Sequence, residues 1–197
     1  MKKALSLFLV FVLVAALLSG CSSAPTADLT EKNVKKTVGI VFEALKDFDI
    51  ETLETYVKST ALSKIVTFAK DHDQFVDLGK AIFGNLTYEI TEIDLDAMTV
   101  TLSVKNKDLE QAASDFANDL FNDFSLLELL AQLNDDSWLD ENLSSLVKSI
   151  DASELNSNPT EITLKIREGA DNLVLRFSSE AENAVSGGAL GAIMSYF

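Results

Sequence analysis

The sequence offers few side chains whose chemistry could drive a reaction. His72 is the single imidazole, and it stands in the charged run Lys70-Asp71-His72-Asp73-Gln74. Neighbouring carboxylates could tune this imidazole to act as a general base. A solvated surface histidine near a helix end explains the same pattern more simply, and serine-based catalysis would have to use this one imidazole. We therefore expect no catalytic residue in this chain.

Pairs of carboxylates recur along the chain, and hard cations such as calcium take several oxygen ligands. The pairs are Asp71 with Asp73, Asp94 with Asp96, Asp135 with Asp136, and Asp140 with Glu141. None of them belongs to an Asp-x-Asp-x-Asp-Gly loop that carries a glutamate at its twelfth position. One histidine and one cysteine also exclude the Cys/His clusters of structural zinc sites. We predict a solvated acidic surface, with no metal and no other cofactor.

The only cysteine follows an apolar segment at the N-terminus. Two lysines precede residues 4–18, an apolar run of about 15 residues, whereas a membrane-spanning helix needs roughly 20. The run ends in Leu18-Ser19-Gly20-Cys21, whose small residues suit the cleavage site of a signal peptidase. We predict that residues 1–20 are a signal peptide that is removed on export.

The ending Leu18-Ser19-Gly20-Cys21 resembles the lipobox of bacterial lipoproteins. The resemblance implies that the signal peptidase recognises Leu18, Ser19 and Gly20, and that Cys21 becomes the first residue, carrying thioether-linked diacylglycerol with fatty-acid chains such as palmitate. Two or more acyl chains anchor a protein stably without a spanning helix. Residues 21–32 would then be the lipidated N-terminus and a flexible tether. We expect the protein on the extracytoplasmic face of the cell membrane.

The chain is strongly acidic, which restricts its partners. It has 197 residues, with 16 Lys and Arg against 31 Asp and Glu, and a formal net charge of -15. Loss of Lys2 and Lys3 with the signal peptide would leave 14 basic and 31 acidic residues, a charge of -17. This charge repels phosphate groups, so we expect no nucleic-acid binding, and a cationic partner would fit better. The mature chain, about 177 residues, is long enough for one domain, predicted over residues 33–197.

Apolar residues at spacings of three and four predict helices, and strict alternation predicts strands. The first helix is expected at 32–48, and Asp49 is placed to cap a short second one. Asp108 is placed to cap a long helix that reaches residue 130. Further helices are expected near 62–70, 75–83, 138–150 and 180–197. Two hairpins are expected at 86–104, with a bulge near Thr91-Glu92, and at 162–177.

These elements predict an α+β domain. Its core would be a curved antiparallel sheet of about four strands, with N-terminal, inserted and C-terminal helices packed on one face. The helical insert, at about 108–150, separates the two hairpins. A parallel sheet would require strands that alternate one by one with helices.

Three segments of the mature chain carry a family resemblance. They are Ala44-Leu45-Lys46-Asp47-Phe48-Asp49-Ile50-Glu51-Thr52-Leu53, Val104-Lys105-Asn106-Lys107-Asp108 and Asn183-Ala184-Val185-Ser186-Gly187-Gly188-Ala189-Leu190. Together they resemble small bacterial lipoproteins of unassigned function with a nuclear transport factor 2-like (cystatin-like) fold. The resemblance, over about residues 34–197, implies a cone-like sheet around helices. The helical insert departs from this pattern, so the usual cone pocket would be filled or reshaped.

That superfamily includes both enzymes and non-catalytic binding modules, so the fold alone does not decide the function. We expect a non-catalytic binding or interaction module of the bacterial cell envelope, anchored to the membrane through its N-terminal diacylglycerol. Its partner would be a small apolar ligand or an envelope protein. The alternative is a cone-fold enzyme that uses a buried carboxylate as acid or base on a small substrate.

Overall fold

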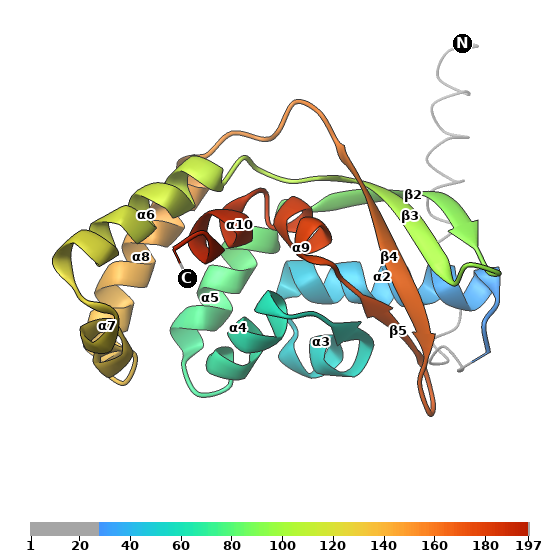
Figure 1. Cartoon of the computed structure of the whole chain (residues 1–197), viewed down its shortest axis with the longest axis horizontal. Coiled ribbons are helices and arrows are strands. Elements are labelled where there is room, and N and C mark those ends of the chain that lie inside the picture. Colours follow the sequence, from blue (N-terminus) through green and yellow to red (C-terminus); the bar gives the residue numbers. More distant parts are fainter. Residues whose placement is uncertain (1–27, 197) are drawn as a thin grey trace, which may run out of the picture.

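The computed structural model describes residues 28–196, which form an α+β fold (Figure 1). Its N-terminal part is helical and contains α2 (Glu31–Asp47), α3 (Ile50–Tyr56), α4 (Ala61–Ala69) and α5 (Asp73–Phe83). The Thr30 side chain caps α2 by accepting a hydrogen bond from the Asn33 amide at 3.2 Å. The predicted cap at Asp49 is confirmed, because its carboxylate accepts from the Thr52 amide at 3.2 Å.

A five-stranded sheet contains β1 (Val57–Lys58), β2 (Thr87–Asp94), β3 (Thr99–Lys105), β4 (Thr160–Glu168) and β5 (Leu173–Arg176), in the order β1-β5-β4-β3-β2. Both predicted hairpins are confirmed as antiparallel pairs, and the register shift between Ile90 and Glu92 confirms the bulge. The expectation of about four antiparallel strands is wrong, because β1 pairs with β5 in parallel and makes the sheet mixed. Two residues are too few to show alternation, so this strand left no pattern in the sequence.

The insert between β3 and β4 consists of α6 (Glu110–Asp123), α7 (Leu126–Gln132) and α8 (Asp136–Ala152). The prediction of one long helix from Asp108 is wrong. The helix stops because Ser125 starts a new one through a capping box, in which Ser125 and Glu128 bond each other's backbone amides. The residue at the cap of α6 is Leu109, which provides no side-chain hydrogen bond, so Asp108 does not cap this helix.

The C-terminal segment forms two helices, α9 (Ser179–Val185) and α10 (Ala189–Met194), where one was expected. The chain turns between them at Gly187 and Gly188, whose φ angles are 61° and 91°. Any side chain at Gly187 would collide with the carbonyl oxygen of Lys107. This backbone conformation and this close approach both require glycine, and they end the helix.

Helices α2, α3 and α9 pack on the sheet, and the hydrophobic core lies between these layers. The expectation that the inserted helices also pack on the sheet is wrong, because α6 packs mainly on α10 and α8 on α5. Alternate residues of β3, β4 and β5 point to the helices and are buried, whereas the residues between them are exposed or half-buried. The buried set is Val100, Leu102, Val104, Ile162, Leu164, Ile166, Leu173 and Leu175. The core is therefore one cluster that extends from the sheet into the helical layer.

Candidate functional site

In a cone-shaped fold the pocket would lie on the covered face of the sheet. In this protein core side chains occupy that face. Leu102, Leu164 and Leu175 are fully buried, and Phe42 and Phe48 belong to the same cluster. The Phe48 ring stacks on Phe83 with centroids 6.1 Å apart. The two pockets described below are lined by helices, loops and β1, and no residue of β2–β5 contributes to them.

Glu182 on α9 is the one buried carboxylate among the described residues. Its Oε1 accepts a hydrogen bond from the Ser59 hydroxyl and another, at 2.9 Å, from the Ala61 amide. The Ser59 oxygen in turn accepts from the Leu62 amide at 3.0 Å. The Glu182 and Ser59 side chains thus cap α4, whose own cap residue forms no side-chain hydrogen bond. This carboxylate has a structural role and does not face either pocket.

Tyr88 on β2 is a partly buried tyrosine that packs against the core. Its ring lies against Phe42, with centroids 4.3 Å apart. Burial of the side chain, and to a lesser extent the negative charge of Glu43, raises the pKa of the Tyr88 hydroxyl above its ordinary value. The hydroxyl therefore keeps its proton at neutral pH and provides no base.

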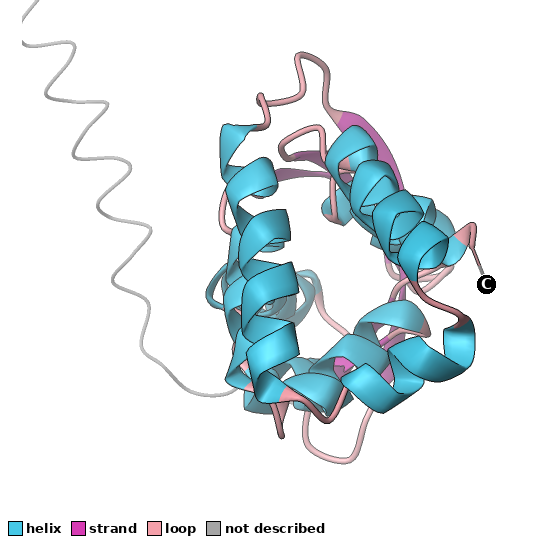
Figure 2. Ribbon diagram, turned by 90° about the vertical axis from the view of Figure 1, so that its left-hand side faces the viewer, coloured by secondary structure: helices cyan, strands magenta, loops and turns pink. Residues whose placement is uncertain are grey.

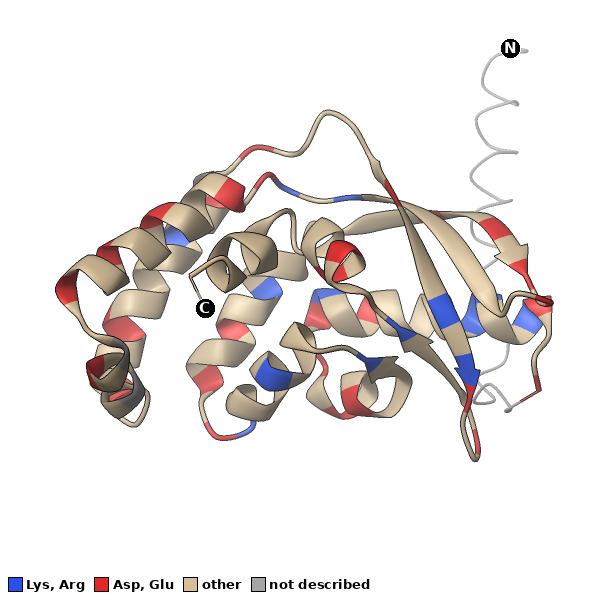
Figure 3. Ribbon diagram, in the orientation of Figure 1, with Lys and Arg blue, Asp and Glu red and all other residues tan. Residues whose placement is uncertain are grey.

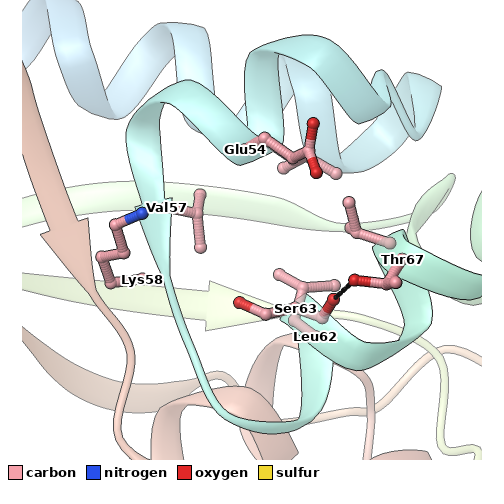
Figure 4. A pocket seen from close by; sticks show the side chains of 8 residues that line it. Glu54, Val57, Lys58, Leu62, Ser63 and Thr67 are labelled. Carbon is pink, nitrogen blue, oxygen red and sulfur yellow. Dashed lines mark hydrogen bonds between the residues drawn. The ribbon is translucent and has the colours of Figure 1, made fainter.

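A small pocket of about 240 Å³ lies between α3 and α4 (Figure 4). Its apolar lining comes from Leu53, Val57, Leu62 and Val66, and its polar lining from Glu54, Lys58, Ser63 and Thr67. Thr67 donates its hydroxyl to the carbonyl oxygen of Ser63 at 2.9 Å, and Glu54 forms an ion pair with Lys70 at 2.6 Å. The volume is below the roughly 300 Å³ at which ligand pockets commonly begin.

A larger groove of about 400 Å³ separates α6 from α8. We name it the insert groove. The side formed by α6 and the residues before it contains Asp108, Gln111, Ala112, Asp115, Phe116 and Asp119. The side formed by α8 and the residue after it contains Ser145, Leu146, Ser149, Ala152 and Ser153. Figure 2 views the molecule from this end, with the insert nearest the reader.

Residues of the predicted charged run join α5 to α8. The Nδ1 atom of His72 lies 3.3 Å from an Asp136 carboxylate oxygen, and Gln74 donates from its Nε2 to Asp140 at 2.6 Å. The His72 side chain is 17% exposed, so the expectation of a solvated histidine is wrong. The Phe75 ring, 6.3 Å from the imidazole between ring centroids, covers part of it. The carboxylate paired with His72 is therefore that of Asp136, whose side chain is 74% exposed.

Two of the predicted carboxylate pairs contain a residue that accepts hydrogen bonds from nearby backbone amides. Asp94 accepts from the Ala97 amide in the β2–β3 turn, and Asp135 caps α8 by accepting from two amides. Within residues 28–196, no group of three or more His, Cys, Asp or Glu side chains could hold a metal ion. The lipidation residue Cys21 and the recognition residues Leu18, Ser19 and Gly20 lie outside the described part of the chain.

Comparisons with protein families, curated proteins and solved structures found no match to this chain. No helix in the described residues is long and apolar enough to cross a membrane. Single motifs do not reveal the insert groove, because its two sides lie about 30 residues apart in the sequence. One signal was available: residues 108–152 contain eleven acidic residues and one basic residue.

Proposed function

We propose that this protein is a lipid-anchored interaction module of the bacterial cell envelope, which binds a partner and does not convert a substrate. Cys21 carries the diacylglycerol anchor, and the folded domain lies on the extracytoplasmic face of the membrane. Within this proposal the sheet and its helices are a nuclear transport factor 2-like cone whose interior has become core. The charge of -17 in the mature chain disfavours nucleic acid as the partner.

The observation that carries the proposal is the filled face of the sheet. Leucine, valine and phenylalanine side chains occupy the position at which a cone-fold enzyme would bind its substrate. Two hollows of the described surface lie elsewhere, one formed by α3, β1 and α4 and the other between α6 and α8. Loops and exposed side chains at the rims of these hollows can differ without loss of the fold, so they are suitable positions for binding.

The sizes of the two hollows favour a protein partner over a small apolar ligand. The α3–α4 pocket, at about 240 Å³, is small for an organic ligand. The insert groove is larger but open, and its exposed polar lining suits a polypeptide better than an apolar molecule. The enzyme alternative requires a buried carboxylate that faces a substrate, whereas Glu182 faces Ser59 and the Ala61 amide.

Native mass spectrometry tests this proposal on protein recovered from the envelope of its own host, after mild cross-linking in intact cells. We expect a complex with a second protein at a fixed stoichiometry. The Cys21→Ala variant, which would lack the anchor, provides the matched control and should yield less of this complex. A reproducible added mass of small-molecule size would instead support a ligand pocket, and an uncross-linked monomer would contradict the interaction module.

A further inference from the structure

The negative charge of this protein is concentrated in the helical insert. Residues 108–152 contain eleven acidic residues and only Lys148 as a basic one, a formal charge of -10. The mature chain as a whole carries -17, so about a quarter of its length holds more than half of the net charge. Figure 3 shows red segments along the insert, whereas blue segments gather on β4, β5 and α2. The field of the protein therefore attracts cations toward one end of the molecule.

The insert groove has one acidic side and one hydroxyl-bearing side. Asp108, Asp115 and Asp119 line the α6 side and are exposed, and none of the described lining residues is basic. Ser145, Ser149 and Ser153 are spaced at intervals of four residues along the opposite side. Residues four apart lie on one face of a helix, so Ser145 and Ser149 lie in a row on α8, and Ser153 follows directly after the helix. The hydroxyls of Ser149 and Ser153 donate to the carbonyl oxygens of Ser145 and Ser149.

Apolar side chains lie between these two polar sides. Ala112 and Phe116 from α6 and Leu146 from α8 line the groove, and Ala152 is exposed at its end. The two helices find their main packing partners elsewhere, since α6 packs on α10 and α8 packs on α5. Their facing surfaces are consequently left partly open, and the groove between them has room for another element.

We propose that the insert groove binds a basic amphipathic helix of a partner protein, which places Lys or Arg side chains against Asp108, Asp115 and Asp119 and apolar side chains against the half-buried Ala112 and Phe116. This inference rests on the proposed function and names the partner's chemistry. It is the helix-in-groove mode of recognition, in which residues on one face of the bound helix act as anchors. On α6, Asp115 and Asp119 are four residues apart, about 6 Å along the helix axis, and Asp108 precedes the helix. Side chains four residues apart also recur on one face of a bound helix.

Charge complementarity favours a basic helix over a second copy of the chain or a small polyamine as the occupant of the groove. A second copy of the chain would bring another charge of -17 and would be repelled. A small polyamine would meet only exposed carboxylates, and an exposed ion pair contributes about 0 to 1 kcal/mol. A polypeptide also removes the apolar lining of the groove from water, which adds roughly 25 cal/mol for each Å² that is buried.

The groove is also remote from the end at which the described chain begins. In Figure 1, α2 starts at the right of the molecule, whereas α6, α7 and α8 lie at its left. A domain tethered through the residues before α2 would present the insert groove away from its point of attachment. A partner could then dock without displacing the tether.

Two lysine substitutions on α8 test the groove. Ser149 lines it and Ser144 does not, yet both serines are exposed on the same helix. Ser149→Lys places a competing cation in the groove, and Ser144→Lys makes the same change in charge outside it. The protein is the mature chain with Cys21→Ser, and the probe is a labelled 14-residue peptide of lysine and leucine at helical spacing, followed by fluorescence anisotropy.

We expect Ser149→Lys to weaken binding of the peptide about tenfold and Ser144→Lys to change it less than about twofold. Binding should also weaken as salt is raised, because the carboxylates are exposed. Equal effects of the two lysines, or no measurable binding of the peptide, would overturn the proposal. Displacement of the peptide by an equal concentration of spermidine would assign the groove to small polycations instead.

A second pair of variants removes charge in place of adding it. Asp115→Asn combined with Asp119→Asn should weaken binding of the peptide about tenfold. Glu89→Gln combined with Glu161→Gln removes two charges from the exposed face of the sheet and should change binding little. Equal losses of binding in the two double variants would indicate that the peptide is attracted by net charge alone, and would contradict binding in the insert groove. The peptide measurement does not need the lipid anchor, so its result holds even if Cys21 is not lipidated. If a native protein complex forms but the peptide does not bind, the proposal for the insert groove is refuted and the proposed interaction module is not.

Discussion

Asn106 donates a hydrogen bond from its side-chain Nδ2 to the carbonyl oxygen of Val185, at 2.8 Å. The same nitrogen donates to the carbonyl oxygen of Ile82, also at 2.8 Å, and the side-chain oxygen accepts from the Lys107 amide. Asn106 is 2% exposed. One buried amide, placed just after β3, therefore joins the last turn of α5 to the last turn of α9 and holds the sheet against both helices.

Asn106→Ala should destabilise the domain by about 2 to 4 kcal/mol, because two buried carbonyl groups lose their donor and a small cavity remains. Urea unfolding followed by circular dichroism measures this change. Asn158→Ala is the matched control, since Asn158 is exposed in the loop before β4 and its loss should change stability by less than about 0.5 kcal/mol. Similar midpoints for the two variants would show that the Asn106 hydrogen bonds contribute little.

Two helical glycines should respond to alanine in opposite directions. Gly79 lies in α5 directly beneath the Phe48 ring, and an added Cβ would collide with that ring. Phe48 is buried and has a φ of 50°, so its ring has little freedom to move. Gly79→Ala should therefore destabilise the domain by about 1 to 3 kcal/mol, as overpacking does.

Gly39, in α2, provides the comparison. An added Cβ there would meet only the Tyr88 hydroxyl, at an ordinary contact distance of 3.7 Å. Alanine is favoured over glycine in a helix by about 1 kcal/mol, so Gly39→Ala should stabilise the domain by about 0.5 to 1 kcal/mol. Thermal unfolding of both variants checks the prediction. A stabilising Gly79→Ala would mean that the Phe48 ring moves easily, contrary to its close contact with Gly79.

Local patterns predicted the elements that form through local interactions, and they failed at three junctions. Periodicity predicted α2 and both hairpins because each buries one regular face. The break at Ser125 was present in the sequence as Ser-x-x-Glu, a capping-box signature, but the apolar residues on both sides continue the helical period. The Gly187-Gly188 turn and the two-residue strand β1 depend on distant contacts, with Lys107 and β5 respectively.

The candidate site was less predictable than the fold. The sides of the insert groove come from α6 and α8, which only tertiary packing on α10 and α5 brings into position. Single residues such as Asp115 and Ser149 have no distinctive neighbours in the sequence. The excess of acidic residues over residues 108–152 was the readable signal, although it marks a region and does not identify a groove.

The capping box of α7 makes a prediction about pH. The Glu128 carboxylate accepts from the Ser125 hydroxyl at 2.6 Å and from the Ser125 amide at 2.8 Å, and these bonds lower the pKa of Glu128 below its ordinary value of 4.5. A lowered pKa means that the folded state prefers the charged form. The resulting stabilisation of α7 is present above pH 4.5 and is lost as the pH falls through the lowered pKa.

Ser125→Ala should raise the pKa of Glu128 only part of the way to 4.5, because the backbone amide still donates. Carbon-detected NMR titration of the glutamate carboxyl groups measures this shift. Ser137→Ala, on an exposed serine in the first turn of α8, should leave the Glu128 titration unchanged. An unaltered Glu128 pKa in Ser125→Ala would show that the side-chain hydrogen bond does not hold the carboxylate.

Cys21 is the residue on which the membrane location depends. Its thiol is the only sulfur nucleophile in the chain, so Cys21→Ala should abolish incorporation of labelled palmitate and leave unprocessed precursor or soluble protein. Ser22→Ala, one residue later, keeps the thiol and should be labelled and processed like the unaltered chain. The measurement is palmitate labelling in the native host, followed by separation of membrane and soluble fractions. Labelling that persists in Cys21→Ala would refute the lipid anchor, whereas loss of both label and membrane association in that variant alone would establish it.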